Sequence, residues 1–115
     1  MVTMKVNLDL NLLPSENPGK LPDQEVVFGW FRYAMSQKNP KGLHGSMLRT
    51  WGRIERKFIK AMEEKLDTIE LEEAELDLAK KLFSGSEEIN FPVNSARVIS
   101  SIEDAVMEAK ENPVA

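Results

Sequence analysis

The first twelve residues alternate between apolar and polar side chains, the pattern of a β-strand with one buried face. A strand cannot satisfy its own backbone N–H and C=O groups, and an isolated pair of strands is only marginally stable in water. Residues 1–12 therefore need a partner: extended segments later in the chain, a second copy, or another protein. The apolar residues expected to contact that partner are Val2, Met4, Val6, Leu8, Leu10 and Leu12.

A proline-rich segment follows this strand. Residues 13–22 contain Pro14, Pro18 and Pro22, and Asn-Pro-Gly stands at 17–19. Proline fixes φ and has no backbone donor, so we expect a stiff, extended connector that spans about 30 Å. Such a connector lets the strand fold over its own domain or reach a neighbouring molecule.

The rest of the chain, residues 23–112, is expected to form a helical domain, because its apolar residues recur at intervals of three and four. Asp23 and Ser46 are candidate N-caps, as is either Asn94 or Ser95. The pattern predicts a mainly α (α+β) fold: a compact four-helix domain with an N-terminal β-strand arm and a small sheet of two or three strands. The helices are expected over residues 23–37, 46–66, 72–83 and 95–111, with short extended segments at 68–71 and 89–93.

Composition excludes several kinds of site. The 115 residues include no cysteine, which excludes disulfides, thiolate catalysis and thiolate metal ligands. There is no apolar run of roughly 18 residues and no basic, then apolar, N-terminal segment, so we expect neither a membrane span nor a signal peptide. The sequence also lacks a P-loop, a nucleophile elbow and a paired-carboxylate motif. We therefore expect a cytoplasmic, non-enzymatic protein without a cofactor or a metal.

The net charge of −4 is unevenly distributed. Residues 41–60 carry six basic and one acidic side chain, whereas residues 61–80 carry two basic and eight acidic ones. In the second predicted helix, Met47, Trp51, Ile54 and Phe58 form the core side, and most of the basic residues lie opposite. We call the basic set the basic stripe: Arg49, Arg53, Arg56, Lys57 and Lys60.

Several interpretations of the basic stripe remain open. Like charges three or four residues apart on a helix repel each other, so a nearby anion would stabilise this segment. That anion is a nucleic-acid phosphate, the acidic segment of the same chain, Glu70–Asp77, or a carboxylate of a neighbouring subunit; alternatively, water alone solvates the stripe. The overall acidic charge, and the placement of Trp51 and Phe58 on the core side, count against nucleic acid.

Two further features have ordinary structural explanations. The acidic residues between 63 and 77 lack the spacing of a calcium loop, so we expect them to be a solvated helix face, with Ala74, Leu78 and Leu82 supplying the core stripe. His44 stands between Gly42 and Gly45 at a helix start, where backbone amides can hold an anion. No third group orients His44 as a general base, and we expect a simple turn.

Two segments open helices in a way that is shared with other proteins. They are Thr68-Ile69-Glu70-Leu71-Glu72-Glu73-Ala74-Glu75, at the opening of a short helix, and Phe91-Pro92-Val93-Asn94-Ser95-Ala96-Arg97-Val98-Ile99, at the start of the last helix. In this pattern, which covers about two-thirds of the chain, the chain resembles a class of small proteins encoded by phages and prophages. The resemblance implies a viral accessory or structural role, in the host cytoplasm or the virion, and implies no catalytic residue.

The main hypothesis from the sequence is an interaction or assembly protein that oligomerises, or binds another protein, through its N-terminal strand. A nearly equal alternative pairs residues 4–10 within the chain, with residues 69–71 and 89–93 as a small sheet against the helices. The alternative function is nucleic-acid binding through the basic stripe.

Overall fold

The computed structural model describes residues 3–83 and 89–111, and their architecture confirms the mainly helical fold with a small sheet. In addition to the helices and strands, two 3-10 turns occur at Pro14–Glu16 and Val93–Ser95. In chain order, the elements are β1 (Thr3–Asn7), α1 (Asp23–Lys38), α2 (Gly45–Glu64), β2 (Thr68–Glu72), α3 (Glu73–Phe83), α4 (Ala96–Met107) and β3 (Lys110–Glu111).

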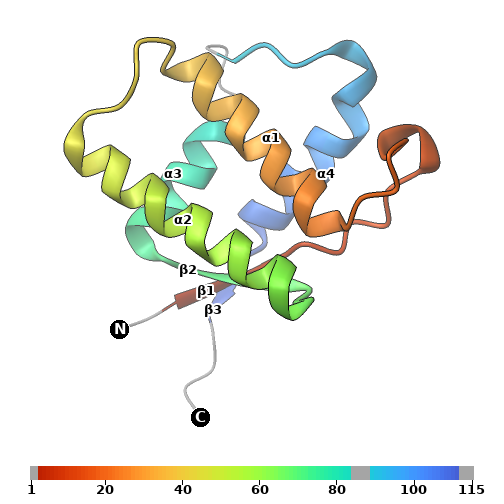
Figure 1. The fold of residues 1–115 in the computed structure, drawn as a ribbon, viewed down its shortest axis with the longest axis horizontal. Coiled ribbons are helices and arrows are strands. Elements are labelled where there is room, and N and C mark those ends of the chain that lie inside the picture. Colours follow the sequence, from red (N-terminus) through yellow and green to blue (C-terminus); the bar gives the residue numbers. More distant parts are fainter. Residues whose placement is uncertain (1–2, 84–88, 112–115) are drawn as a thin grey trace.

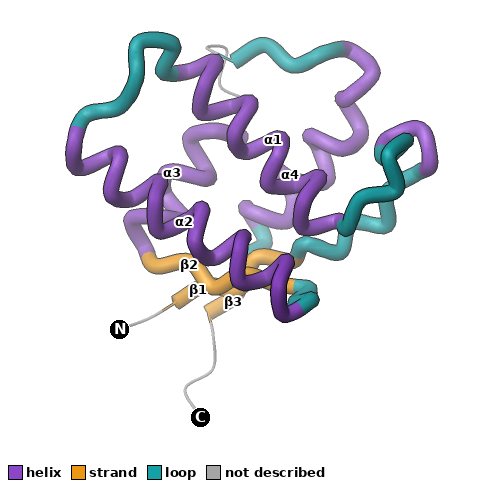
Figure 2. Tube along the Cα trace, viewed as in Figure 1, coloured by secondary structure: helices purple, strands orange, loops and turns teal. Residues whose placement is uncertain are grey.

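The helices form two layers, and the strands close one end of them. Figure 1 shows α1 and α2 running in opposite directions across one side, with α3 and α4 behind them. Figure 2 shows the strands gathered below the helices, where β2 leads directly into α3. Elements from the two ends of the chain therefore meet in one sheet.

The N-terminal strand is the middle strand of this sheet. The order is β2-β1-β3, and β1 is antiparallel to both neighbours across the described part of the chain. Beyond β1, the Leu8 N–H still donates to the Asp67 carbonyl oxygen at 2.7 Å. The β1–β2 register aligns Met4 with Leu71 and Val6 with Ile69 on the core side, and Lys5 with Glu70 on the outer side.

This pairing corresponds to the alternative in which the N-terminal strand pairs within its own chain, with one correction. Residues 68–72 pair with β1 as expected, but residues 89–92 form a loop and Val93–Ser95 form a 3-10 turn. The third strand is instead β3, in a segment expected to be the end of the last helix. That helix, α4, already ends at Met107, where the Glu108 N–H caps it by donating to the Asp104 carbonyl oxygen at 2.8 Å.

Strand pairing ends earlier than the alternating pattern. After Asn7 the chain turns, because the Asn7 amide side chain bonds both the N–H and the C=O of Asp9. The alternation of burial nevertheless continues: Leu8 is fully buried, and Leu10 and Leu12 pack against the core. The period of two therefore predicts the buried face correctly to residue 12, although regular strand stops at residue 7.

The proline-rich segment is a folded loop and not an extended connector. The Asn17 side chain bonds both the N–H and the C=O of Leu21, at 2.9 and 2.7 Å, which closes the segment into a tight turn. The Glu16 carboxylate accepts from the Leu13 N–H at 2.7 Å and forms an ion pair with Arg97 of α4 at 3.6 Å. Side-chain hydrogen bonding of this kind competes with extended structure, and here it prevails.

Aromatic residues from three helices meet at the centre of the core. The Phe58 ring lies 5.0 Å from both Phe28 and Phe31, and Phe31 lies 4.8 Å from Phe83, measured between ring centroids. Phe31 and Phe58 are fully buried.

Two predicted N-caps are one or two residues too late in the sequence. Pro22, not Asp23, occupies the N-cap position of α1, and His44, not Ser46, occupies that of α2. Neither side chain makes a capping hydrogen bond.

Replacing a core residue of the N-terminal segment should destabilise the chain. We expect Leu8→Ala to lower the free energy of unfolding by about 2–5 kcal/mol, since it removes a fully buried side chain and leaves a cavity. Leu13→Ala, at a position 45% exposed, is the matched control and should cost much less. Urea unfolding measures both. Equal, small effects would mean that residue 8 is not part of the core.

Candidate functional site

The basic stripe lies along α2 on the side that faces away from the core. Trp51, Ile54, Phe58 and Ala61 are the buried residues of this helix. They recur at intervals of three and four, so one side of α2 packs against α1 and α3. The predicted division of the helix into an apolar and a basic side is therefore correct. Arg49, Arg53, Arg56 and Lys60 are exposed, and Lys57 is half-buried.

The two lysines of the stripe have carboxylate partners. Lys57 forms an ion pair with Glu75 of α3, and Lys60 forms a looser one with Glu64, one turn along α2, at 3.9 Å. Across the part of the chain that the structure describes, no carboxylate lies within 4.0 Å of the guanidinium groups of Arg49, Arg53 or Arg56. Among the described residues, the acidic segment therefore forms an ion pair with one of the five basic residues, Lys57.

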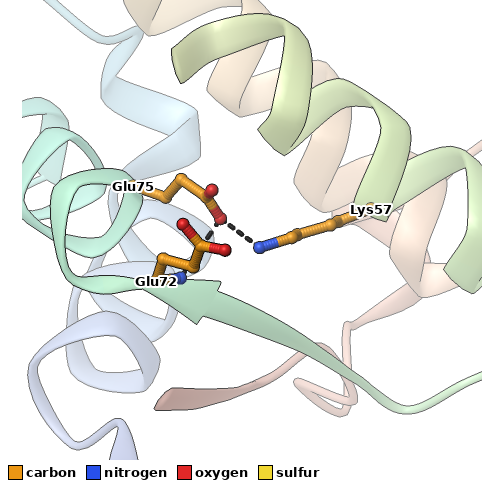
Figure 3. A network of polar contacts seen from close by, with 3 residues as sticks. All are labelled: Lys57, Glu72 and Glu75. Carbon is orange, nitrogen blue, oxygen red and sulfur yellow. Dashed lines mark hydrogen bonds and ion pairs between the residues drawn. The ribbon is translucent and has the colours of Figure 1, made fainter. Parts of the chain in front are cut away.

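The Lys57–Glu75 pair joins α2 to the junction of β2 and α3. Figure 3 shows Lys57 reaching from α2 toward this junction. One Glu75 carboxylate oxygen, Oε1, accepts both from Lys57 Nζ and from the Glu72 N–H, the latter at 3.2 Å. Glu75 is only 1% exposed, and its Oε2 has no hydrogen-bond partner among the described residues. A buried carboxylate of this kind depends on its cation, because desolvation strongly disfavours an unpaired charge.

Burial of Glu75 corrects the interpretation of the third helix. Glu75 was expected to be solvated and Ala74 to belong to the core stripe, whereas Ala74 is exposed and Glu75 is buried. The sequence does indicate that Glu75 lies on the buried side of the helix. Leu78, Ala79 and Leu82 follow it at intervals of three, four and seven residues, which places all four on one side. The side chain is tolerated in the core because Lys57 faces it.

A groove of about 440 Å³ runs between the C-terminal half of α2 and the outer face of the sheet. Its charges nearly balance, with Lys5, Lys57 and Lys60 set against Glu70 and Glu72. Lys5 also stands opposite Glu70 in the β1–β2 register, where opposite charges attract. The excess positive charge of α2 is therefore on its outer side, at the three arginines.

Of the six residues expected to contact a partner through the N-terminal strand, the five that the structure describes pack against the core of their own chain. Val6 and Leu8 are buried, and Met4, Leu10 and Leu12 are partly buried against the core. Val2 lies outside the described residues. Because β1 has a strand on each side at residues 4 and 5, its backbone is not an open edge there. The physical reason for expecting a second chain is thus removed for this part of the strand.

His44 was the other single residue that the sequence offered as a candidate. His44 is exposed at the start of α2, and its side chain makes no capping hydrogen bond. Within residues 3–83 and 89–109, no group of three or more histidine, aspartate or glutamate side chains is arranged to hold a metal ion. A search of the same residues finds no helix with the length and apolar character of a membrane span.

Three aspartates meet where the N-terminal segment passes the start of α1. Asp23 is half-buried beside Asp9, and Asp67 is close enough to act on its charge. Burial raises the pKa of the Asp23 carboxyl, and the negative charges of Asp9 and Asp67 raise it further. A hydrogen bond from the Leu10 backbone opposes this shift. Periodicity cannot reveal this cluster, because its members come from three separate segments.

Comparison of the chain with protein-family models, curated proteins and solved structures found no match.

The Lys57–Glu75 pair should matter more for stability than the exposed pair beside it. We expect Lys57→Met to lower the free energy of unfolding by about 2–3 kcal/mol, because it leaves the buried Glu75 carboxylate without a cation. Lys60→Met, which breaks an exposed pair, should cost less than about 1 kcal/mol. Adding Glu75→Leu to Lys57→Met should restore part of the loss. Equal losses in the two single variants would show that Glu75 does not depend on Lys57.

The aspartate cluster predicts that Asp23 opposes folding at neutral pH. A carboxyl whose pKa is raised on folding binds its proton more tightly in the folded state, so stability falls as pH rises through that pKa. Asp23→Asn removes the charge and keeps an acceptor for the Leu10 N–H. Thermal unfolding should show no stability gain near pH 3, where the carboxyl is largely protonated, and a growing gain toward about pH 7.

Glu25→Gln is the control for Asp23→Asn. Glu25 is an exposed acidic residue in the same first turn of α1, so its variant reports loss of the helix-dipole interaction alone. A loss of stability in Asp23→Asn at every pH, matching that of Glu25→Gln, would contradict repulsion within the cluster.

Proposed function

We propose that the protein is a non-enzymatic nucleic-acid-binding protein that contacts phosphates through Arg49, Arg53 and Arg56 of α2. The observation that carries the proposal is that these three guanidinium groups are exposed on one side of one helix without a carboxylate partner in the described chain. Guanidinium groups bind phosphate oxygens in a planar, two-pronged geometry, which suits a row of phosphates.

The arrangement of the arginines supports an external anion. Arg49 and Arg53 are four residues apart and Arg56 follows three later, so neighbouring charges repel each other by a few tenths of a kcal/mol per pair. Lys60 is four residues beyond Arg56, but Glu64 already accompanies it. Of the other candidate sources of anions, the acidic segment forms one ion pair with the stripe among the described residues, between Glu75 and Lys57. Phosphates would offset the repulsion that remains.

The acidic part of the chain would orient the protein on a nucleic acid. Residues 61–80 carry a net charge of −6 and would be repelled by a phosphate backbone. Only the outer side of α2 would then face nucleic acid. Assembly through the N-terminal strand, the main alternative, would require β1 to leave a neighbouring strand at residues 4 and 5, where it is paired on both sides.

Salt dependence of binding tests the proposal. Neutralising three phosphates predicts a slope of about −2.7 for log K against log salt, at roughly 0.9 per phosphate. Arg49→Gln with Arg53→Gln should reduce the slope to about −0.9 and weaken binding at low salt. Fluorescence anisotropy with a labelled DNA duplex measures both quantities.

A second double variant controls for net charge. Lys20→Gln with Lys41→Gln removes two exposed positive charges from loops outside α2, and the slope should stay unchanged. If the two double variants weaken binding alike, the interaction is not localised on α2. If the unaltered chain shows no salt-dependent binding to any nucleic acid at low ionic strength, the proposed function is wrong.

A further inference from the structure

The outer side of α2 has a broad solvent-exposed surface. Leu48 and Ile59 are 55% and 44% exposed and lie together at one edge of this surface. The three arginines lie beside them, so the five residues cover about 140° of the helix circumference at 100° per residue. From Arg49 to Lys60 this surface is about 16 Å long. It ends at Glu63 and Glu64, whose charges would repel phosphates. The basic part is therefore the first three turns, at the positive end of the helix dipole.

Gly52 lies within this surface. A glycine inside a helix costs about 1 kcal/mol relative to alanine, which normally calls for a packing reason. Here a Cβ atom at position 52 would meet no atom within 4 Å, so nothing inside the described chain requires glycine. Gly52 stands on the same side of α2 as Arg49, Arg53 and Arg56. It provides a place where an external molecule can approach the helix backbone closely.

The exposed surface contains no aromatic side chain of α2, because the aromatic residues of that helix, Trp51 and Phe58, are buried. Proteins that hold single-stranded nucleic acid usually stack its bases on exposed aromatic rings. A single strand is therefore a poor match for this surface. A duplex, whose phosphates and groove edges can be contacted without stacking, is a better one.

We propose that the partner is duplex DNA and that α2 lies in its major groove with Gly52 against the groove edge. A helix with its side chains is about 10–12 Å across, and the major groove of B-form DNA is about 12 Å wide. Arg49, Arg53 and Arg56 then reach the flanking phosphates or guanine edges. The major groove of an A-form RNA duplex is too narrow for a helix, so the same surface discriminates against RNA. This inference rests on the proposed function.

The test uses the full chain with three labelled molecules: a short DNA duplex, an RNA duplex of the same sequence, and one DNA strand. At a single salt concentration we expect the DNA duplex to bind at least about tenfold more tightly than either of the others. Gly52→Leu should weaken duplex DNA binding at least about tenfold, because the added side chain separates α2 from the groove.

Gly29→Leu is the matched control, since Gly29 is also a helical glycine whose Cβ would meet no atom within 4 Å, but it lies on α1. Its duplex affinity should stay within about twofold of the unaltered chain. Both variants replace glycine with a stronger helix former, so thermal unfolding should show no loss of stability in either. If Gly52→Leu is nevertheless destabilised, Gly52→Ala, with a smaller side chain, replaces it and should weaken DNA binding more than Gly29→Ala.

The other outcomes separate this inference from the proposed function. Equal binding of the DNA duplex and the RNA duplex would indicate phosphate contact without groove insertion, and would overturn the inference alone. Tighter binding of the single strand, or full duplex affinity in Gly52→Leu, would do the same. Failure of all three nucleic acids to bind at low salt would overturn the proposed function as well.

Discussion

The antiparallel pairing of β1 with β2 is the constraint on which the rest of the structure depends. It joins the first residues of the chain to residues 68–72 and places Val6 and Leu8 in the core. β2 in turn determines where α2 must end. Lys65 takes a left-handed conformation with φ of 55°, and its N–H caps α2 by donating to the Ala61 carbonyl oxygen. Three residues later, at Thr68, the chain enters the sheet. Strand pairing therefore positions the C-terminal end of α2, and with it the direction of the basic stripe.

Lys57 differs from the arginines of α2 because its charge is paired with a buried carboxylate, that of Glu75. Lys57 points toward the junction of β2 and α3, where Glu75 Oε1 accepts hydrogen bonds from both Lys57 Nζ and the Glu72 N–H. The core side of α2 is then held by aromatic packing and one ion pair together. The arginines are left on the opposite side, where the described chain supplies no carboxylate to them. A chain with a net charge of −4 thus presents a basic surface along α2.

Local patterns in the sequence predicted the parts of the fold that depend on local geometry. The alternation over residues 2–12 gave the buried face of the first segment, and the spacing of Trp51, Ile54 and Phe58 gave the two sides of α2, because side-chain direction follows directly from backbone type. Both periodicities survive in the structure, even where regular strand stops at Asn7.

What the sequence did not predict depends on contacts between distant residues. β3 has two residues, too few for a period, and its pairing with β1 is set by where α4 ends. The fold of the proline-rich loop depends on the Asn17 side chain closing on Leu21, and the burial of Glu75 depends on Lys57, eighteen residues earlier. The same limit applied to the strand's partner, since alternation shows that a partner is needed but not which segment provides it.

Binding is proposed to occur through the outer side of α2 and not through the N-terminal strand. An NMR titration of the isotope-labelled chain with a short DNA duplex, following backbone amides and arginine side-chain N–H groups, distinguishes the two surfaces. We expect chemical-shift changes concentrated between residues 46 and 60, strongest at Arg49, Gly52, Arg53 and Arg56, with the amides of β1 unchanged. Changes centred on residues 3–12, or no changes at low salt, would show that α2 is not the binding surface.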